Sequence, residues 1–436
     1  MTEPVPTLTV VIPALNERRN LERLLPALRD ELAGLGVPAE VVVVDGGSTD
    51  GTVGAATRAG ARVVAQSEPG YGGALLAGFA ATRASWIVTM DADLSHRPVF
   101  LREFWKRRHD AEVLIASRWI AGGYADMSRF RRLLSLLLNR IYSRVLSLPI
   151  RDLSSGFRMY RRATLAGVTL QACDFDALEE LLIRIHAAGW RIEEVPFQYA
   201  ARGSGRSHAR LLRLGWAFTR TLARMWRLRN SVLAADYDWR AFASPIWLQR
   251  YWQRARHRIV LDYLDSRAPS AGAAPAATRG ATVDVGCGSS RIIVDLPDAL
   301  GVDVLASKLR WLRERHTRLL CASGDRLPLA AASAGALIHS EVLEHVTNPA
   351  DHLAEAARVV RPGGTLVVGT PDYGRPLWLI LEWVYGKLLP GAYAHEHVTR
   401  LTRAGLERLL AEHGFDVLDL RYVGFCEMIF KARRRT

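Results

Sequence analysis

The chain has 436 residues, of which 49% are hydrophobic and 23% charged, and its formal net charge is +14 at pH 7. This length exceeds the size at which a single hydrophobic core stops growing, so two domains are expected. The composition is that of an ordinary soluble globular protein. The longest apolar runs, such as residues 41–44, have the length of strands and not of membrane spans.

Cysteine usage and the first residues indicate where the protein works. The four cysteines lie far apart in the sequence, which argues against a disulfide framework, a zinc site or an iron–sulfur cluster. Residues 1–17 lack a basic segment followed by an apolar one, so no signal peptide is predicted and a cytoplasmic location is expected. The excess positive charge is concentrated at 128–150 and 202–230, and it would attract nucleic acid, anionic lipid or phosphorylated substrates.

The first half of the chain alternates short apolar runs with helical patterns. Alternation of this kind is typical of an α/β fold with a parallel-rich sheet and crossover helices. The expected strands are residues 8–14, 40–48, 61–66, 85–93 and 111–118, and the expected helices are residues 17–34 and 73–83.

A second series of strands begins at residue 281 with its own glycine-rich turn, as a separate doubly wound sheet would. Before it comes a stretch rich in Ala, Pro, Gly and Ser, residues 266–280, which predicts a flexible loop. Residues 236–265 are expected to form a helix that packs on the second sheet, so we place the domain boundary before that helix. The predicted domains are residues 1–231 and 232–436.

Two aspartates end the expected strand at 85–93. Asp91 and Asp93 would lie at the carboxyl end of a parallel sheet, where such sheets bind ligands, and two carboxylates there suit a divalent metal ion that neutralises a diphosphate leaving group. A lone Asp-x-Asp is more often a solvated turn. Glu17 and Asp45 follow the first two strands at the same edge and suit hydrogen bonds to a base or ribose. Their alternatives are a helix cap for Glu17 and a turn for Asp45.

Seven motifs in order over residues 6–210 resemble glycosyltransferase family 2, in particular its dolichol-phosphate mannose synthase branch. They are VIPALNE (11–17), VVDGGSTDGT (43–52), GYGGAL (70–75), DADLSH (91–96), Ser117-Arg118, DLSSGFRMYRR (152–162) and EEVPFQYAARGSGRS (193–207). The resemblance implies a GT-A fold, an inverting mechanism, a GDP- or UDP-linked sugar donor, and Mg²⁺ or Mn²⁺ on Asp91 and Asp93. The residues that it implies are Pro13, Glu17 and Asp45 for the nucleotide, and Arg118, Asp152 and Arg202 for catalysis and binding near the acceptor.

Three departures from that branch concern the metal, a phosphate contact and the base. Ser95 stands where a glutamine commonly follows the Asp-x-Asp pair, and residues 205–208 replace a basic pair that usually ends in lysine. Relatives that glycosylate hydroxyls carry a catalytic aspartate where this chain has Leu178, and only Glu180 and Asp176 remain nearby. Because a lipid phosphate is already an anion and needs no base, the missing base favours an acceptor such as a polyprenyl phosphate.

Segment 128–150 carries five arginines among its leucines. Such a helix could lie on an anionic membrane, which would place the protein peripherally on the inner face of that membrane. It could equally be an ordinary amphipathic helix packed on the sheet. The arginines are Arg129, Arg131, Arg132, Arg140 and Arg144.

The second series opens with VDVGCGSSR (283–291), a strand followed by a glycine-rich turn and a helix. Such a turn lets the backbone approach a nucleoside or its amino-acid tail. Asp303 follows the next strand, where ribose hydroxyls would be held, and Asp325 is placed to meet an adenine edge. The alternative for both aspartates is turn formation. The candidate cofactor contacts in the first turn are Asp284, Gly286 and Gly288.

Later motifs extend this pattern over residues 281–430, which resemble class I methyltransferases of the methyltransferase-11 type. The resemblance implies a Rossmann-like fold and S-adenosylmethionine as the cofactor. For a hydroxyl acceptor the enzyme must also supply a base; His345 and His397 are the candidates, and Glu341 or Glu344 could take that role. His395 and His397 lack cysteine partners, which argues against a structural zinc site. The later motifs are HSEVLEHV (339–346), RVVRPGGTLVVGTPD (358–372) and HEHVTRLTRAGL (395–406).

The leading hypothesis is a bifunctional enzyme that transfers a sugar to a polyprenyl phosphate-like lipid and methylates a glycan, glycolipid or related product. In an alternative, both groups are placed on a hydroxyl of a small metabolite or peptide. The basic composition suggests a third reading, a nucleic-acid-binding methyltransferase with a degenerate first domain. The chain lacks an aromatic–basic RNA motif and keeps the Asp91/Asp93 pair, so no nucleic-acid partner is expected.

Overall fold

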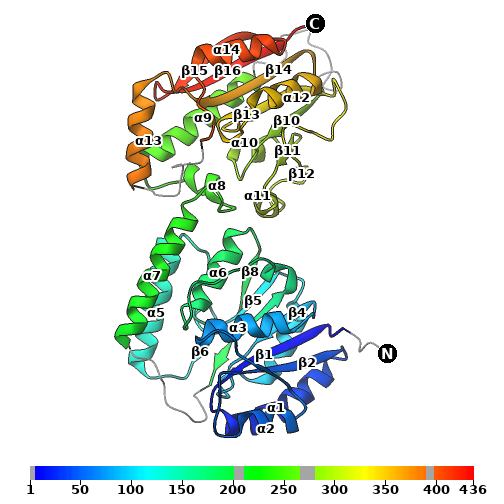
Figure 1. Ribbon diagram of the computed structural model, residues 1–436, viewed down its shortest axis with the longest axis vertical. Coiled ribbons are helices and arrows are strands. Elements are labelled where there is room, and N and C mark those ends of the chain that lie inside the picture. Colours follow the sequence, from blue (N-terminus) through cyan, green and yellow to red (C-terminus); the bar gives the residue numbers. More distant parts are fainter. Residues whose placement is uncertain (1–4, 201–210, 266–279, 389–396) are drawn as a thin grey trace. The chain divides into compact units, whose positions relative to one another are not determined.

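The structure, a computed structural model, describes residues 5–200, 211–265, 280–388 and 397–436 (Figure 1). Its contacts divide the chain into two compact units, each built on a seven-stranded sheet. The first unit contains residues 1–186 and 190–226, and the second contains residues 187–189 and 227–436.

Several sequence predictions concern residues outside the described ranges. Arg202, residues 205–208, His395 and nearly all of the predicted loop at 266–280 belong to this group. The domain boundary placed after residue 231 stays a prediction. Among the described helices, none is long and apolar enough to cross a membrane.

The sheet of the first unit has the strand order β3-β2-β1-β4-β7-β5-β8. The first four strands are parallel, β7 runs antiparallel between β4 and β5, and β8 is parallel to β5. The parallel-rich sheet with crossover helices is confirmed, with one antiparallel strand added. The bounds are β1 Leu8–Ala14, β2 Ala39–Asp45, β3 Arg62–Ala65, β4 Trp86–Thr89, β5 Val113–Ser117, β7 Arg158–Arg161 and β8 Ile192–Pro196, with β6 Tyr124–Ala125 and β9 Gln198–Tyr199 as a separate pair.

Helices pack on both faces of this sheet, and alternate strand residues contribute to the two cores because successive side chains point to opposite faces. Val10 and Ile12 of β1 share a core with Leu21 and other leucines of α1, whereas Val11 shares a different one with Ala74 of α3. The helices are α1 Arg18–Gly34, α2 Thr52–Arg58, α3 Gly70–Ala81, α4 Leu101–Arg107, α5 Arg129–Val145, α6 Ala177–Ala187 and α7 Leu211–Arg229, with short 3₁₀ helices at Pro98–Phe100 and Arg162–Leu165.

The sheet of the second unit has the order β12-β11-β10-β13-β14-β16-β15. Its first five strands are parallel, and β16 is antiparallel to both β14 and β15. The order reverses on either side of β10, so the turn after β10 lies where doubly wound sheets bind ligands. The strands are β10 Ala281–Val285, β11 Leu300–Asp303, β12 Leu319–Cys321, β13 Ala334–Ser340, β14 Val360–Pro371, β15 Phe415–Val423 and β16 Glu427–Arg434.

The single helix expected at 236–265 is wrong, because the structure has two helices there. Helix α8 (Tyr237–Phe242) ends before Pro245, and α9 (Trp247–Asp265) begins after it. Proline cannot donate to the helical ladder and clashes with the preceding turn. Helix α9 does pack on the second sheet, where Val260 shares a core with Ile338 and other strand residues. The remaining helices are α10 Arg291–Val294, α11 Ala306–Leu312, the 3₁₀ helix η4 Leu343–His345, α12 Pro349–Val359, α13 Pro376–Leu388 and α14 Arg403–Glu412.

Candidate active sites

The two aspartates of the first unit follow β4 at the carboxyl edge of its sheet. The Asp91 carboxylate is partly exposed, and its Oδ1 accepts a hydrogen bond of 3.0 Å from the Tyr71 hydroxyl. Asp93 is buried, and its Oδ1 accepts from the backbone N–H and the hydroxyl of Ser95. Ser95, which departs from the family pattern, therefore orients Asp93. Two oxygen donors fit Mg²⁺ or Mn²⁺, which commonly bind one or two carboxylates together with substrate phosphates.

Tyr71 and Gly156 complete this edge and were missed in the sequence analysis. A Cβ at Gly156 would lie 2.9 Å from the Tyr71 hydroxyl and 3.3 Å from Asp91 Oδ1, so only glycine fits beside the aspartate. Burial, then the neighbouring charge of Asp91, holds the pKa of Tyr71 well above its usual value. Both residues belong to the motifs GYGGAL and DLSSGF, but no local pattern reveals that these motifs meet.

Pro13, Glu17 and Asp45 lie at the same edge of the sheet. In the β1–β2 register Pro13 is opposite Val44 and Ala14 is opposite Asp45. The Asp45 carboxylate accepts hydrogen bonds from the backbone N–H groups of the two residues that follow Gly46. It therefore stabilises a turn, which is the alternative role given for Asp45 in the sequence analysis. The Glu17 side chain caps no backbone group of α1 and instead accepts from the Asn20 amide.

Arg118 and Asp152 form one unit. The Arg118 guanidinium donates two hydrogen bonds, of 2.8 and 2.6 Å, to the carboxylate of the fully buried Asp152, and it also reaches the Ser154 hydroxyl. Burial lowers the pKa of Arg118, but the charge and hydrogen bonds of Asp152 outweigh it and leave the pKa raised. Asp152 thus acts as an anchor that holds a permanent positive charge in place.

The acidic residues near the missing base differ sharply in their surroundings. The Asp176 carboxylate accepts from Thr221. Glu180 accepts from two backbone N–H groups and from Arg184 and Arg224. Glu179 is fully buried, and neither of its oxygens has a hydrogen-bond partner among the described residues. Burial raises the pKa of Glu179 to about 8. Sequence reasoning considered Glu180 and missed Glu179, because the two adjacent glutamates look alike in the sequence.

Helix α5 presents apolar side chains to solvent. Only Asn139 and Tyr142 of this helix are buried, and the Tyr142 hydroxyl donates to the Phe218 carbonyl. All five of its arginines are exposed. The exposed apolar residues of α5 are Phe130, Leu133, Leu134, Leu136, Leu137, Ile141 and Val145.

A cavity of about 400 Å³ in the second unit lies at the carboxyl ends of β10, β11 and β13. Gly286 and Gly288 have φ of +69° and +55°, and a Cβ at Gly286 would lie 2.3 Å from a methyl carbon of Val342. The turn therefore requires glycine and brings bare backbone to the cavity wall. The predicted site residues that line the cavity are Asp284, Gly286, Gly288, Asp303, Glu341 and His345.

Two buried aspartates face this cavity. Asp303 accepts from the backbone N–H groups of Gly288 and Leu305. Burial, followed by the charge of Asp303, raises the pKa of Asp284 to about 8, and Asp284 Oδ2 has no partner among the described residues. Carboxylates beside a glycine turn fit a nucleoside with vicinal hydroxyls and an amino-acid tail, as S-adenosylmethionine has.

The lining of this cavity differs from the sequence prediction at Asp325, and it includes Gly324 and Asp238, which were not predicted. The Asp325 side chain is exposed and does not line the cavity, whereas its neighbour Gly324 does. Asp238 of α8 was missed: its Oδ2 accepts from the backbone N–H and hydroxyl of Ser289 and from Lys308 Nζ at 2.6 Å. Its position some 50 residues before the glycine turn gave no local signal.

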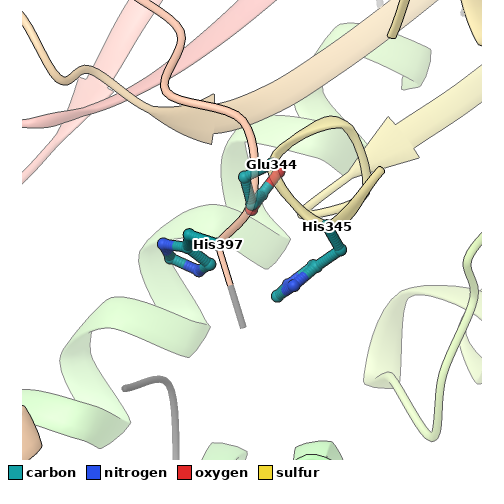
Figure 2. A group of neighbouring side chains, drawn as sticks. All are labelled: Glu344, His345 and His397. Carbon is teal, nitrogen blue, oxygen red and sulfur yellow. The ribbon is translucent and has the colours of Figure 1, made fainter. Parts of the chain in front are cut away.

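His345 and His397 lie together although they are 52 positions apart in the sequence. Their ring centroids are 5.0 Å apart, and Glu344 lies beside both (Figure 2). His345 lines the cavity and His397 does not. Burial, followed by the charge of His345, lowers the pKa of His397 to about 3, which keeps its imidazole neutral. Burial also raises the pKa of Glu341 and of Glu344.

A smaller cavity of about 70 Å³ adjoins the 400 Å³ cavity. It lies between α9 and α13 and shares Gln253, Arg256 and Glu341 with the larger cavity. Trp252 and Trp378 form part of its wall. The outer surface of α13 is also apolar, with Leu377, Leu379, Ile380, Trp383 and Val384 exposed.

Comparisons with known proteins agree with the two units. Residues 9–168 match the family model of glycosyl transferase family 2, and residues 283–368 match that of a methyltransferase domain. The chain is 32% identical over 213 residues to a dolichol-phosphate mannosyltransferase of Pyrococcus furiosus, which covers 46% of this chain and only 58% of that protein. It is 33% identical over 221 residues to an undecaprenyl-phosphate mannosyltransferase of Micrococcus luteus, covering 45% of this chain and 85% of that protein.

Among solved structures, glucosyl-3-phosphoglycerate synthase from Mycobacterium tuberculosis, in complex with Mn²⁺, uridine diphosphate and glucosyl-3-phosphoglycerate, is similar with a TM-score of 0.40. The identity is 23%, over 51% of this chain and 80% of that one. Both resemblances noted in the sequence are confirmed by the family models. The chain belongs to glycosyl transferase family 2 and carries a methyltransferase domain in its second unit.

Proposed function

We propose that the first unit transfers a sugar from a nucleotide-sugar to a lipid phosphate and that the second unit uses S-adenosylmethionine to methylate a glycan, glycolipid or related product. The observation that carries this proposal is that each sheet has, at its carboxyl edge, a group of residues that fits a donor molecule, the nucleotide-sugar in the first unit and S-adenosylmethionine in the second. One is the Asp91/Asp93 pair, and the other is the 400 Å³ cavity with its glycine turn and Asp303.

In the first unit, Asp91 and Asp93 would hold Mg²⁺ or Mn²⁺, which neutralises the charge of the leaving diphosphate when bound. Tyr71 and Ser95 keep the two carboxylates oriented. Arg118, fixed by Asp152, supplies a positive charge that can position an acceptor phosphate. The acceptor oxygen then attacks the anomeric carbon from the side opposite the diphosphate, with inversion.

A phosphate acceptor is favoured by the acidic residues around position 178. Asp176 and Glu180 are committed to hydrogen bonds within the fold, and Glu179 with a pKa of about 8 is protonated at neutral pH. None of them is a ready base, and a phosphate needs none. The names of the two curated relatives, which refer to lipid phosphates, point the same way.

The test of the first activity is sugar transfer from GDP- and UDP-sugars to a polyprenyl phosphate in the presence of Mn²⁺. We expect Asp91→Asn to abolish transfer and Asp30→Asn, an exposed carboxylate of α1, to leave it unchanged. If no donor is consumed, the glycosyltransferase proposal fails. A hydroxyl acceptor remains the second candidate, because Glu179 is a buried carboxyl without a partner among the described residues. Transfer to an alcohol that disappears in Glu179→Gln would favour it.

In the second unit, Asp303 would hold the ribose hydroxyls, and the backbone at Gly286 and Gly288 would approach the amino-acid tail of the cofactor. The cofactor supplies an electrophilic methyl group when bound. His345, at the cavity wall, is the candidate base for a hydroxyl acceptor. Stabilisation by S-adenosylmethionine in a thermal-shift assay tests this proposal. It should be lost in Asp303→Asn and kept in Asp298→Asn, an exposed control.

We also propose that α5 rests on an anionic membrane, since its apolar side chains and its arginines are exposed together. Replacing Arg131, Arg140 and Arg144 by glutamine should weaken sedimentation with anionic vesicles. Replacing Arg403 and Arg408 of α14, which are also exposed, should not. Equal sedimentation of all variants would contradict the membrane contact.

A further inference from the structure

Glu344, His345 and His397 bring three metal-binding groups to one place beside the cofactor cavity. Glu344 and His345 belong to η4, which follows β13, and His397 lies before α14. One ligand atom from each residue lies within 4.8 Å of the other two. Figure 2 shows the three side chains gathered around a common space.

Glu344 gives an independent reason to expect a cation. Its side chain is fully buried, and its Oε2 accepts a hydrogen bond of 3.1 Å from the Thr370 hydroxyl. The carboxyl of Glu341 lies beside it, and burial together with Glu344 raises the pKa of Glu341. Two neighbouring buried carboxyls cannot both be charged without a compensating positive charge, and a bound cation would supply one.

His397 is held as metal-binding histidines usually are. The Tyr373 hydroxyl donates to Glu382 at 2.8 Å and lies 2.7 Å from His397 Nδ1. Since a hydroxyl has one proton, Tyr373 must accept from Nδ1–H, which places the imidazole lone pair on Nε2. Trp378 stacks on the ring. When a histidine binds a metal ion through one ring nitrogen, its other ring N–H commonly donates a hydrogen bond to a nearby oxygen, as Nδ1–H of His397 does here.

We propose that Glu344, His345 and His397 bind a divalent transition-metal ion that takes up the acceptor hydroxyl for methyl transfer. Two imidazoles and one carboxylate are the three protein ligands in one class of catalytic zinc site, which keeps a further coordination position for water or substrate. Because His345 also lines the cofactor cavity, an oxygen held at this ion would lie near the transferable methyl group. The inference rests on the proposed methyl transfer and names its acceptor class as a hydroxyl compound such as a sugar.

The ion would act by making the acceptor hydroxyl more acidic. The hydroxyl releases its proton to water, and its oxygen forms a bond to the methyl carbon. The carbon–sulfur bond breaks with its electron pair on sulfur, so the sulfonium becomes a neutral thioether. This route needs no strong base from the protein.

The test uses the full chain with Asp91→Ala and Asp93→Ala, so that the first unit cannot contribute a metal site of its own. Titration with Co²⁺, followed by visible absorption and calorimetry, should reveal one bound ion. Glu344→Gln and His397→Gln should each weaken binding at least about tenfold. His413→Gln should not, because this histidine of the same unit lies outside the cluster and contacts the Leu409 carbonyl.

Stabilisation by S-adenosylmethionine is measured on the same proteins as a separate readout. Its persistence in Glu344→Gln and His397→Gln shows that both variants are folded. If the Asp91/Asp93 variant is stabilised by S-adenosylmethionine but binds no Co²⁺, Zn²⁺ or Mn²⁺, the metal site is refuted and the proposed methyltransferase function stands. Metal binding that survives in both ligand variants also refutes it. Absence of stabilisation in the wild type overturns the proposed function and the inference with it.

Discussion

Replacing Glu179 by glutamine should make the first unit more stable at neutral and alkaline pH. Glutamine keeps the size of the side chain but has no charge. Glu179 is fully buried in α6, and burial raises its pKa from the ordinary value of 4.5 to about 8. Between these two values the folded chain keeps a proton that the unfolded chain has released. Raising the pH through this window therefore lowers the free energy of unfolding of the wild type.

The size of the effect follows from the two pKa values. Each pKa unit is worth about 1.4 kcal/mol, so the wild type should lose about 3 kcal/mol of stability by pH 7 and about 5 kcal/mol by pH 9 relative to pH 4. Glu179→Gln should lose none of this part. The neighbouring Glu180→Gln is the matched control with the opposite sign. Its carboxylate accepts from Ala172 N–H and Arg184, and its loss should cost roughly 1 to 3 kcal/mol.

Scanning calorimetry between pH 5 and 9 measures these changes. Because two units unfold separately in many such chains, the transition that S-adenosylmethionine does not shift is assigned to the first unit. If the wild type and Glu179→Gln show the same pH dependence of that transition, Glu179 is ionised in the folded chain. The reasoning would then be wrong, and Glu179 would become available as a base for a hydroxyl acceptor.

Three further substitutions test the two donor sites. Gly156→Ala should reduce sugar transfer by about tenfold or more, since its Cβ would crowd the Tyr71 hydroxyl and displace Asp91, measured as kcat at saturating Mn²⁺. Gly286→Ala should abolish stabilisation by S-adenosylmethionine, because φ is +69° and the new Cβ would meet Val342. The wild-type second unit should lose stability as the pH rises from 4 to about 8, because Asp284 must then ionise in a buried position. Asp284→Asn should lack this loss, and the melting temperature of its second unit should therefore depend less on pH.

The carboxyl edges of both sheets could be predicted from the sequence because each depends on local order. A buried strand followed by Asp91, or by the turn at Gly286, identifies the strand end without any long-range information. The antiparallel strand β7 could not be predicted in this way, because its neighbours β4 and β5 are fixed only by the assembled sheet. The break at Pro245 was available in the sequence and was overlooked.

Contacts across long stretches of sequence account for the site residues that were missed. Tyr71 meets Asp91 through a hydrogen bond, and Glu344 meets His397 only when the segment before α14 returns to β13. Glu179 and Glu180 show the limit most clearly. They are adjacent, identical in type and both buried. Glu180 accepts hydrogen bonds from four residues, whereas Glu179 has no hydrogen-bond partner among the described residues.

Asp238 shows that a helix before the second sheet contributes to the glycine turn of that unit. The residue lies in α8, before the sheet, yet its carboxylate accepts from Ser289 in the glycine turn and from Lys308 after β11. The charge of Lys308 and these hydrogen bonds outweigh burial and keep the pKa of Asp238 low, so the carboxylate stays ionised beside the turn. By accepting from the Ser289 backbone N–H, this anion fixes the conformation of the turn before a ligand binds. We therefore propose that the functional methyltransferase unit begins before α8, and that α8 helps to shape the cofactor site.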